Sequence, residues 1–487
     1  MNMYEAFAAV AERNLSRMAI IDGEKRFTYE QLLRAVGKFS VVAAAHSSRE
    51  AVGVYLPTCA AFVISYYGLL KAGFGVMPIN LLAPPRDITF SLKDAGVDTI
   101  VTSEKLLPNL KDVPARLIIL EELVKAGLFR KLKWYAASRL NRRPEPSADS
   151  LATLLYTSGT TGTPKGVRLT HGNILSNIED CLKVVALTPE DVTIGILPLF
   201  HTFAVTVTMG VPMHSGGTFV THLRFNPDAT LRDVQEHRVT LLVGIASMFR
   251  VMSMTKKLKD FDTSSVEIAI SGGEPLPPRV AKDFEDVFGQ ELLEGYGLTE
   301  ASPVVSVNPP GRNRPGTAGL PLERVKVRAV DDDGKALPAG DVGELLVSGP
   351  SVMQGYHNRP DETAKVIVDG WLHTGDMARI DGDGYVAITG RKKEMIIVGG
   401  ENVFPAEVEA VLEEHPLVAQ AAVIGVQDEK RGESVKAIII PSEPSANADD
   451  ILCFARQHLA PYKVPRVIEF RSEVPLSPTG KILKRAL

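Results

Sequence analysis

The chain has 487 residues, of which 45% are hydrophobic and 23% are charged. This is the composition of an ordinary globular protein, and the net charge of −4 gives no sign of a nucleic-acid-binding surface. Three scattered cysteines, Cys59, Cys181 and Cys453, argue against a disulfide framework or a zinc site and fit a reducing cytoplasm. No apolar run reaches the length of a membrane span, and the N-terminus lacks a signal pattern.

Short apolar runs alternate with helical patterns in the first part of the chain. The predicted strands are 51–55, 76–79 and 99–102, and the predicted helices are 60–72 and 85–95. The same rhythm returns later, with predicted strands at 193–197, 218–220, 240–243 and 267–270. This alternation predicts parallel strands that are joined by crossover helices.

The pattern changes near residue 325, where short predicted strands are joined by Asp/Gly turns and indicate a β-rich subdomain over about 325–390. The chain from 392 onward reads as a hairpin, a helix, two strands and a second helix. We therefore expect an α/β protein. A large N-terminal domain over 1–391 would contain mixed, mainly parallel sheets with flanking helices, and a small α+β domain would occupy 392–487.

One segment differs in charge from its surroundings. Residues 123–143 carry large apolar and basic side chains but no acidic one. The basic residues are Lys125, Arg130, Lys131, Lys133, Arg139, Arg142 and Arg143. The pattern predicts a basic amphipathic helix, which could lie on an anionic membrane surface or dock an acidic carrier protein. The plainer interpretation is a solvated helix that covers one edge of a sheet.

A glycine-rich stretch at 156–166 reads Tyr-Thr-Ser-Gly-Thr-Thr-Gly-Thr-Pro-Lys-Gly. Its glycines allow close backbone approach to a ligand, and its hydroxyls and Lys165 suit a polyphosphate. An apolar run at 151–156 precedes it and a helical pattern at 171–187 follows, so we expect a strand, a phosphate loop and a helix. Pro164 before the lysine and Gly166 after it exclude the Walker A pattern.

A second motif, Glu-Gly-Tyr-Gly-Leu-Thr-Glu at 294–300, places an aromatic residue between two glycines. Tyr296 can therefore present its ring to a nucleobase with little steric competition. Thr299 offers a hydroxyl, and Glu300 offers the kind of oxygen ligand that Mg²⁺ prefers. The motif alone also fits a buried tyrosine at the end of a strand.

Taken in this order, the two motifs resemble the signature of the adenylate-forming superfamily, which includes acyl-CoA synthetases, aryl-CoA ligases, luciferases and peptide-synthetase adenylation domains. The resemblance covers essentially the whole chain, because further motifs match at 271–275, 371–376, 390–405 and 475–481. It implies that the C-terminal domain is mobile and rotates about a hinge at Lys393 between two half-reactions.

The resemblance also implies a role for each matching residue. The nucleotide-binding residues would be Thr157, Ser158, Gly159, Thr160, Thr161, Gly162 and Lys165 at the phosphates, Gly272, Gly273, Glu274, Tyr296 and Gly297 around the adenine, Thr299 at the α-phosphate, and Asp376 and Arg391 at the ribose. The catalytic residues would be Lys481, Thr299, Glu300 and His201, with Glu300 holding Mg²⁺ and His201 gating the acyl channel. Gly399, Gly400 and Glu401 would line the path of the pantetheine thiol.

The implied reaction is the ATP-dependent activation of a carboxylic acid to acyl-AMP, followed by thioester formation and release of AMP. ATP and Mg²⁺ would be required, together with CoA or the phosphopantetheine of a carrier protein. The acid is already ionised at neutral pH, so its attack on the α-phosphate needs no general base. We expect a cytoplasmic enzyme, with 125–143 as the candidate segment for contact with a membrane surface.

The acyl pocket is expected around Gly297, where short-chain members of the family carry a tryptophan. The expected lining residues are Phe200, His201, Phe203, Val243, Gly297 and Val304. A glycine at 297 would leave the tunnel open, and the absence of Asp or Arg among the lining residues disfavours amino-acid substrates. We therefore expect a medium- to long-chain fatty acid, with CoA as acceptor. The open alternatives are an acyl-ACP synthetase, a ligase for an aryl or other carboxylic acid, and a non-catalytic acyl- or nucleotide-binding protein on the same fold.

Overall fold

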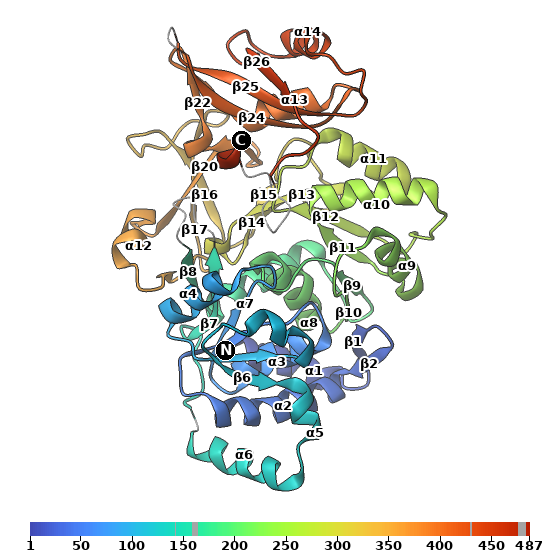
Figure 1. The fold of residues 1–487 in the computed structure, drawn as a ribbon, viewed down its shortest axis with the longest axis vertical. Coiled ribbons are helices and arrows are strands. Elements are labelled where there is room, and N and C mark those ends of the chain that lie inside the picture. The colour runs from blue at the N-terminus through green and yellow to red at the C-terminus, as the bar shows by residue number, and fades with distance from the viewer. Residues whose placement is uncertain (142, 158–163, 429–430, 476–483) are drawn as a thin grey trace.

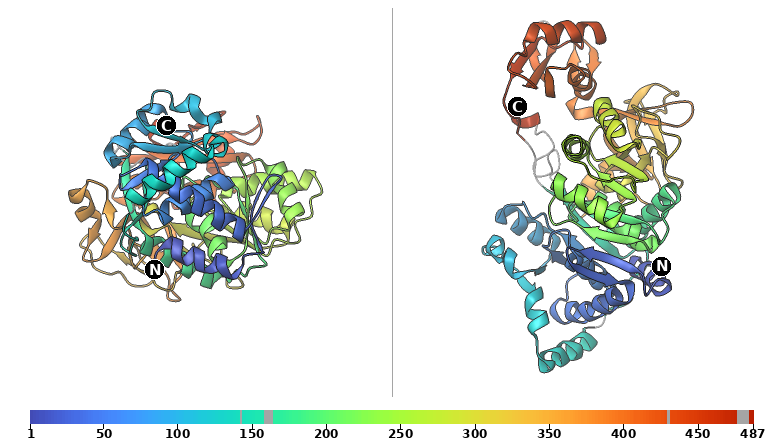
Figure 2. Two further views of the ribbon diagram at one scale, coloured as in Figure 1. Left: turned by 90° about the horizontal axis from the view of Figure 1, so that it is seen from below. Right: turned by 90° about the vertical axis from the view of Figure 1, so that its right-hand side faces the viewer.

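The computed structural model describes residues 1–141, 143–157, 164–428, 431–475 and 484–487. A large N-terminal domain contains two mainly parallel sheets and a smaller antiparallel sheet, and a small α+β domain lies at one end of the molecule (Figure 1). The predicted fold class is therefore confirmed. The side view shows the same order along the long axis (Figure 2).

The first sheet has seven strands in the order β18-β8-β7-β4-β3-β5-β6. These strands are β3 (Ala51–Val54), β4 (Gly75–Pro78), β5 (Thr99–Thr102), β6 (Arg116–Ile119), β7 (Leu151–Thr157), β8 (Lys165–Thr170) and β18 (Gly355–Tyr356). Strands β3 to β7 pair in parallel, whereas β8 and β18 add an antiparallel edge. The helices α3 (Ala60–Lys71) and α4 (Pro85–Ala95) confirm the predicted alternation of strands and helices.

The second sheet has nine strands in the order β15-β14-β13-β12-β11-β9-β10-β1-β2. They are β1 (Met18–Asp22), β2 (Lys25–Thr28), β9 (Val192–Gly195), β10 (Thr218–Thr221), β11 (Leu241–Gly244), β12 (Ile268–Gly272), β13 (Leu292–Gly297), β14 (Val304–Val307) and β15 (Leu320–Pro321). The helices α9 (Pro227–His237), α10 (Ala246–Leu258) and α11 (Pro278–Phe288) pack on one face through an apolar cluster that includes Leu231, Phe249 and Phe284.

The main core lies between the two sheets. It contains fully buried residues of both, such as Val52 and Val76 from the first sheet and Phe219 and Leu241 from the second. The helices around it are α1 (Met3–Arg13), α2 (Tyr29–His46), α7 (His171–Val185), the π-helix η2 (Ala204–Gly210) and α8 (Val211–Ser215). Because the second sheet is buried on both faces, the residues at the ends of its strands are held in fixed positions.

The β-rich subdomain forms an antiparallel sheet of its own. Its strands are β16 (Lys326–Val330), β17 (Val342–Ser348), β19 (Ile367–Val368), β20 (Trp371–Ile380) and β21 (Val386–Arg391), and the short α12 (Pro360–Val366) lies beside it. The ten-residue β20 is the central strand that the sequence pattern missed. Gly375 at φ +71° and an irregular register with β17 interrupt its alternation, so no continuous strand was predicted there.

The C-terminal domain contains β22 (Ile396–Val398), β23 (Glu401–Val403), α13 (Pro405–Glu413), β24 (Val418–Asp428), β25 (Gly432–Pro441), α14 (Ala448–His458) and β26 (Val467–Phe470). The described residues also form four short 3-10 helices: η1 (Glu104–Leu110), η3 (Thr299–Ala301), η4 (Lys392–Glu394) and η5 (Lys484–Ala486). The chain passes from β21 through η4 into the C-terminal sheet. The division near 391 and the domain rotation both stay predictions.

The basic segment forms two helices where the sequence pattern predicts one. The helix α5 (Leu120–Lys125) ends before Ala126 and Gly127, and α6 (Leu128–Leu140) follows in a new direction against α2 (Figure 1). Gly127 precedes α6 with an extended backbone and makes no side-chain cap. Among the helices that the structure describes, none has the length and apolar character needed to cross a membrane.

Candidate active site

Three predicted nucleotide-binding residues meet where the nine-stranded sheet touches the β-rich subdomain. The hydroxyl of Tyr296 on β13 donates a hydrogen bond to Oδ2 of Asp376 at 2.5 Å, and Nε of Arg391 lies 3.2 Å from Oδ1. Asp376 and Arg391 are direct partners on β20 and β21. Burial and the nearby Asp376 carboxylate raise the pKa of Tyr296 well above its usual value, so its hydroxyl keeps its proton and donates.

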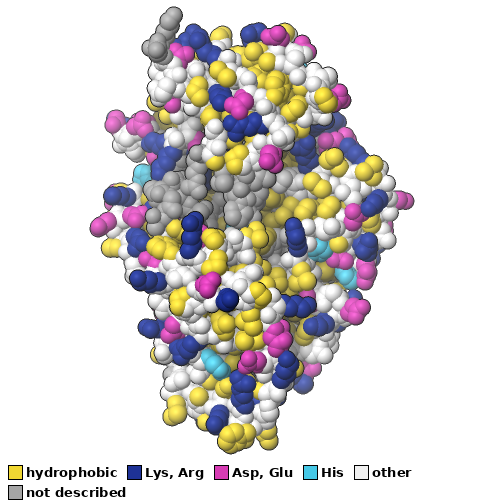
Figure 3. Space-filling view, viewed as in Figure 1, with side chains coloured by type: hydrophobic (Ala, Val, Ile, Leu, Met, Phe, Trp, Pro, Cys, Tyr) yellow, Lys and Arg dark blue, Asp and Glu magenta, His cyan; other side chains and the backbone are white. Residues whose placement is uncertain are grey.

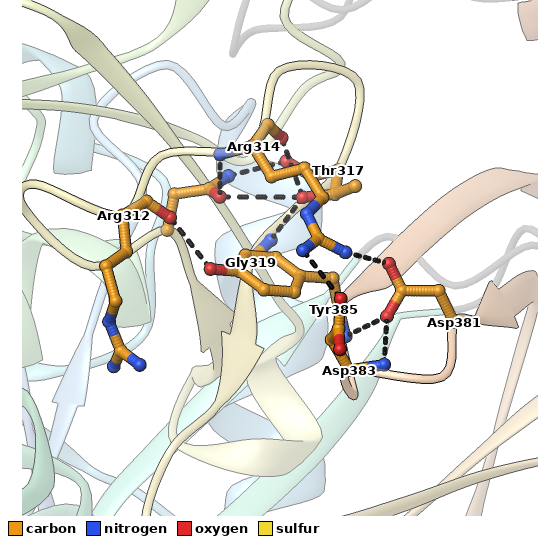
Figure 4. Close-up of polar contacts among 8 residues, drawn as sticks. Arg312, Arg314, Thr317, Gly319, Asp381, Asp383 and Tyr385 are labelled. Atoms are coloured by element: carbon orange, nitrogen blue, oxygen red, sulfur yellow. Dashed lines mark hydrogen bonds and ion pairs between the residues drawn. The ribbon is translucent and has the colours of Figure 1, made fainter.

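A polar cluster fixes the turn between β20 and β21 to the large sheet. The Arg314 guanidinium pairs with Asp381 and Asp383 in this turn and stacks 4.0 Å from the centroid of the Tyr385 ring (Figure 4). The backbone N–H of Arg314 in turn donates to Asn308, which follows β14. Since the same turn connects the strands that carry Asp376 and Arg391, this cluster holds these two residues in place relative to β13.

Thr299 and Glu300 lie in η3, directly after β13. The hydroxyl of the buried Thr202 donates to Oγ1 of Thr299 at 3.0 Å, and the Tyr356 hydroxyl donates to Oε1 of Glu300 at 2.9 Å. Burial and the Glu300 charge raise the pKa of Tyr356, which keeps it a donor. The two predicted catalytic side chains are therefore oriented by neighbours before any ligand binds.

Lys165 lies next to this pair. Its Nζ is 5.0 Å from the centroid of the Tyr356 ring and forms an ion pair with Glu362 on α12. Lys165, Tyr356 and Glu300 thus form a continuous chain of contacts from β8 to η3. The structure brings the lysine of the glycine-rich motif to the residues of the second motif.

The local context of the glycine-rich loop differs from the prediction. The expected order was strand, loop and helix, but the loop joins β7 to β8 in an antiparallel hairpin, and α7 begins only after β8. Val167 and Leu169 are buried and alternate with Arg168, so the residues after the loop form a strand. Ser158, Gly159, Thr160, Thr161 and Gly162 lie outside the described residues, as does Lys481. The described ends of the loop are Thr157 and Lys165, which pair with each other.

A narrow apolar pocket adjoins Tyr296. Its lining residues are Cys181, Val184, Val185, Phe203, Val207, Val211, Leu241, Ile270, Gly272, Gly273, Gly295, Tyr296, Gly297, Pro303, Val304 and Val307. None of these side chains carries a charge at neutral pH, and burial raises the pKa of the Cys181 thiol to about 12. The pocket therefore suits an uncharged, apolar group that ends near the candidate nucleotide site.

Of the six residues expected to line an acyl pocket, Phe203, Gly297 and Val304 do so. Phe200 and His201 lie just before the π-helix η2 with ring centroids 4.6 Å apart, and Val243 is fully buried within β11. These three are not among the lining residues. The sequence pattern missed the contribution of α7, whose residues Cys181, Val184 and Val185 belong to none of the motifs.

Gly297 permits a close approach of two backbone segments. A Cβ at this position would overlap the carbonyl oxygen of Pro303, which also accepts a hydrogen bond from Leu298 N at 3.0 Å. The side chain of the fully buried Asn177 fixes the facing segment through bonds of 2.8 and 3.1 Å to the backbone of Val304. A tryptophan at 297 therefore requires the backbone to move.

The remaining predicted residues lie at two places. Gly272 and Gly273 end β12 at the pocket, and Glu274 accepts a 2.7 Å bond from the Ser247 backbone near the start of α10. On the C-terminal side, Lys393 lies in η4. Gly399, Gly400 and Glu401 form the exposed turn from β22 to β23, with φ values of +62° and +91° at the two glycines. This turn is not part of the pocket.

Three site residues carry no recognisable sequence signal. Thr202, Tyr356 and Glu362 contact Thr299, Glu300 and Lys165, respectively. Each lies between 56 and 197 positions from its partner in the sequence. Only the tertiary arrangement identifies them, since isolated hydroxyls and carboxylates are common on any chain.

Comparison with known proteins agrees with this geometry. A family model described as "AMP-binding enzyme" matches residues 7–357, and a model of the C-terminal domain of the same enzymes matches residues 407–481. The long-chain-fatty-acid–CoA ligase of Bacillus subtilis (strain 168) is 36% identical, and the match covers 98% of this chain and 92% of that protein. A feruloyl-CoA synthase of Amycolatopsis sp. is 35% identical, with 96% and 94% covered.

Solved structures with the same fold include an anthranilate CoA ligase in complex with anthranoyl-AMP, with a TM-score of 0.90, 26% identity, and 100% of this chain and 96% of that chain covered. The o-succinylbenzoate CoA synthetase of Bacillus subtilis in complex with ATP and a magnesium ion has a TM-score of 0.87 and 27% identity, with 99% and 98% covered. The family model spans most of the chain and the curated relatives match nearly its whole length. The chain therefore belongs to the AMP-binding enzymes of the adenylate-forming superfamily and is an acid–thiol ligase of the acyl-CoA synthetase type.

Proposed function

We propose that this enzyme activates a medium- to long-chain fatty acid with ATP to give acyl-AMP and pyrophosphate, and then transfers the acyl group to the thiol of CoA with release of AMP. The observation that carries the proposal is the uncharged pocket that ends beside Tyr296 and Gly297. The lining matches a fatty acid in polarity, since the tail of such an acid is apolar and its carboxylate would be left at the nucleotide side. The names of the curated relatives support the same substrate class.

In the first step, a carboxylate oxygen attacks the α-phosphorus and the bond to the β-phosphate oxygen breaks. The chain's contribution is positioning and compensation of charge. Thr299 would bind the α-phosphate, and Lys165 and the loop 158–163 would hold the β- and γ-phosphates. Tyr296 would stack on the adenine, while Asp376 accepts the ribose hydroxyls beside Arg391. Lys481 would offset the charge that develops between the carboxylate and the α-phosphate.

Glu300 fits the magnesium ion that accompanies ATP. Mg²⁺ is commonly held by one or two carboxylates together with substrate phosphates. Glu300 is half-buried, and Tyr356 bonds to one of its oxygens and fixes its orientation toward the site. When bound, the ion would supply charge compensation at the phosphates, and a magnesium–ATP complex in a related synthetase supports this assignment.

In the second step, the thiol sulfur attacks the acyl carbonyl, AMP leaves, and the thiol proton is released. We propose that the domain over 392–487 rotates about Lys393 for this step. The exposed turn with Gly399, Gly400 and Glu401 would then line the path of the pantetheine. Its open surroundings and positive φ values make a change of position feasible without loss of core contacts.

The substrate alternatives differ in what the pocket must offer. A dicarboxylic or amino acid needs a charged partner, which the described lining residues do not provide. An aryl acid remains the second candidate, because a feruloyl-CoA synthase is 35% identical to this chain. A carrier-protein thiol is the alternative acceptor, since the first step does not depend on the identity of the thiol.

A screen of acids against acceptors tests the proposal. Acetate to stearate and aryl acids such as ferulate are each combined with ATP and either CoA or a carrier protein, and pyrophosphate and thioester are measured separately. We expect the highest kcat/KM for aliphatic acids of medium to long chain with CoA. A preference for aryl acids would contradict the proposed fatty-acid substrate. A preference for the carrier protein would contradict CoA as the acceptor.

A variant of Lys481 tests its assigned step. Lys481→Ala should abolish the formation of acyl-AMP but leave the conversion of supplied acyl-AMP to the thioester largely intact. Lys484→Ala is a matched control, because this nearby lysine pairs with Glu394 and Glu409 within the C-terminal region. Equal loss of both steps in Lys481→Ala would contradict the assignment.

A further inference from the structure

The helix α6 turns its apolar side toward the solvent. Leu128, Phe129 and Leu132 are 75%, 73% and 56% exposed, and Leu140 is 87% exposed. With 3.6 residues per turn, these positions and Tyr135 form one continuous band along the helix. A helix on the surface of a globular protein normally buries such a band against the core. The orientation of α6 is therefore the reverse of the usual one.

The opposite, narrower side of α6 attaches it to the protein. Trp134, Ala137 and Ser138 are half-buried, and the Trp134 ring lies 5.8 Å from the His46 ring at the end of α2. Beyond the end of the helix, Asn141 donates to the carbonyl of Ala44 at 3.2 Å. These contacts hold α6 in one orientation. A loosely attached helix therefore does not explain why the apolar band is exposed.

Basic side chains flank the band. Lys131 and Lys133 lie on its two sides, and Arg139 lies within it. The Lys133 ammonium is 4.8 Å from the centroid of the Phe129 ring, and the Arg139 guanidinium is 5.2 Å from that of Tyr135. Among the described residues, no carboxylate forms an ion pair with any of these three cations, whereas Arg130, nearer the protein body, pairs with Glu122.

The helix forms one end of the molecule, and the C-terminal domain forms the other (Figures 1 and 2). Hydrophobic side chains gather at this tip, with Lys and Arg beside them (Figure 3). The tip is convex, which suits a surface that deforms around inserted side chains. A second copy of the chain would place like charges against each other across a self-complementary interface, which disfavours a dimer through α6.

We propose that α6 binds in the plane of an anionic lipid bilayer, with Leu128, Phe129 and Leu132 inserted at the level of the acyl chains. Lys131, Lys133 and Arg139 then reach the phosphate level, since long basic side chains extend from an apolar surface toward polar groups. An acidic carrier protein would satisfy the charges but would not explain three large apolar side chains at the centre of the face. Docking at this end leaves the candidate active site at the far side of the first sheet.

Vesicle sedimentation tests this proposal with the full-length enzyme. Vesicles of equal parts phosphatidylglycerol and phosphatidylcholine should bind the enzyme, and vesicles of phosphatidylcholine alone should bind it much more weakly. Lys131→Glu combined with Lys133→Glu should weaken binding at least about 25-fold, because each basic residue near an anionic surface contributes about fivefold. Phe129→Ser combined with Leu132→Ser should also weaken it, by roughly tenfold for each buried side chain.

Matched controls come from exposed residues elsewhere. Leu223→Ser with Leu258→Ser removes two side chains that are 66% and 86% exposed, and Lys111→Glu with Lys335→Glu makes the same change of charge on other surfaces. Both control pairs should bind like the wild type. All variants should keep the wild-type melting temperature and the wild-type activity with a water-soluble acid, since none of these side chains is buried or lies at the site.

The depth of insertion gives a second measurement. In the Phe129→Trp variant, the fluorescence of the new side chain should shift to shorter wavelength on the anionic vesicles. Lipids with brominated acyl chains should quench this fluorescence. Failure of the wild type to sediment, or equal binding by both α6 double variants, would overturn the proposal. Binding of an acidic carrier protein that both α6 variants lose, without vesicle binding, would assign the helix to a protein partner. A dimer in light scattering that Phe129→Ser and Leu132→Ser dissolve would assign it to self-association.

Discussion

The hydroxyl of Tyr296 donates a 2.5 Å hydrogen bond to Oδ2 of Asp376, although the two residues lie 80 positions apart and belong to different sheets. The bond fixes the ring of Tyr296 relative to a carboxylate that is 6% exposed. A nucleoside bound here would meet an aromatic face and a carboxylate whose separation is already set. This preorganisation reduces the entropy that must be lost when ATP binds.

Two substitutions of Tyr296 separate its ring from its hydroxyl. Tyr296→Phe keeps the ring and loses the bond to Asp376, so we expect the KM for ATP to rise about 2- to 10-fold. Tyr296→Ala also loses the stacking surface, which is worth about 1–3 kcal/mol for a nucleobase, and should raise the KM by a further factor of 5 to 100. The measurement is pyrophosphate release at varied ATP. Equal effects of the two variants would show that the ring does not contact the adenine.

Because Lys165 and Glu362 form an ion pair, we expect substitutions of the two residues to change the affinity for ATP in opposite directions. Lys165→Ala should weaken ATP binding, because it removes the cation assigned to the phosphates. Glu362→Gln should strengthen ATP binding, because Lys165 no longer has to leave a carboxylate partner when the phosphates arrive. Isothermal titration with a non-hydrolysable ATP analogue in the presence of Mg²⁺ measures both.

Glu50→Gln is the control for this pair. Glu50 pairs with Arg168 at the edge of the same strand, so its substitution removes a carboxylate from this region but leaves Lys165 paired. We expect the control to leave the affinity for ATP nearly unchanged. If Glu362→Gln weakens ATP binding, then Glu362 supports the site and does not compete with the phosphates.

Sequence patterns predicted well those elements whose signal lies within a short stretch of consecutive residues. The strand 99–102 and the helix 85–95 have the predicted bounds, because a short apolar run and a proline-initiated amphipathic turn are local signals. The order of the motifs likewise placed Tyr296, Asp376 and Arg391 in one expected nucleotide site, and the three residues lie together in the structure. Tyr296 lies near the end of β13, and Asp376 and Arg391 face each other on the paired strands β20 and β21.

The elements that were missed depend on contacts between distant segments. β8 was not predicted, because its buried residues need β7 and β18 as neighbours before they form a strand. Tyr356 reaches Glu300 only because β18 joins this edge of the sheet. The outward face of α6 could not be derived from its sequence either, since the helical pattern gives the band of apolar residues but not the direction in which it points.

The pocket offers a test of chain length at Val207, on the π-helix. Val207→Phe should shift the preferred acid to shorter chains, because the larger side chain extends into the apolar pocket. Val207→Ala should leave the preference unchanged or move it to longer chains. The profile of kcat/KM across acids from acetate to stearate measures both. Unchanged profiles in both variants would mean that the acyl chain lies elsewhere.

Gly297 is a less suitable position for this test. A Cβ at 297 would overlap the Pro303 carbonyl, so even Gly297→Ala should lower stability by about 1–3 kcal/mol. The effect is visible as a lower melting temperature without any substrate. A fully stable Gly297→Ala enzyme would show that the segment around Pro303 moves easily, despite its two bonds to Asn177.

Glu294 on β13 makes the stability of the enzyme depend on pH. Burial raises the pKa of its carboxyl from 4.5 to about 7, against the smaller opposing effect of a hydrogen bond from the Leu276 backbone. The folded protein therefore holds this proton more tightly than the unfolded chain. The resulting stabilisation is complete below about pH 4.5 and is lost as the pH rises to 7, with a total of about 3 kcal/mol at most.

Melting temperatures at pH 5, 6, 7 and 8 measure this contribution against Glu294→Gln, which is neutral at every pH and keeps an acceptor for the Leu276 N–H. The wild type should lose stability relative to this variant between pH 5 and pH 7, and the difference should level off by pH 8. Glu291→Gln, at an exposed position one residue before the same strand, should follow the wild type at every pH. Parallel curves for the wild type and Glu294→Gln would mean that Glu294 is ionised throughout, with water reaching it from the pocket side of the sheet.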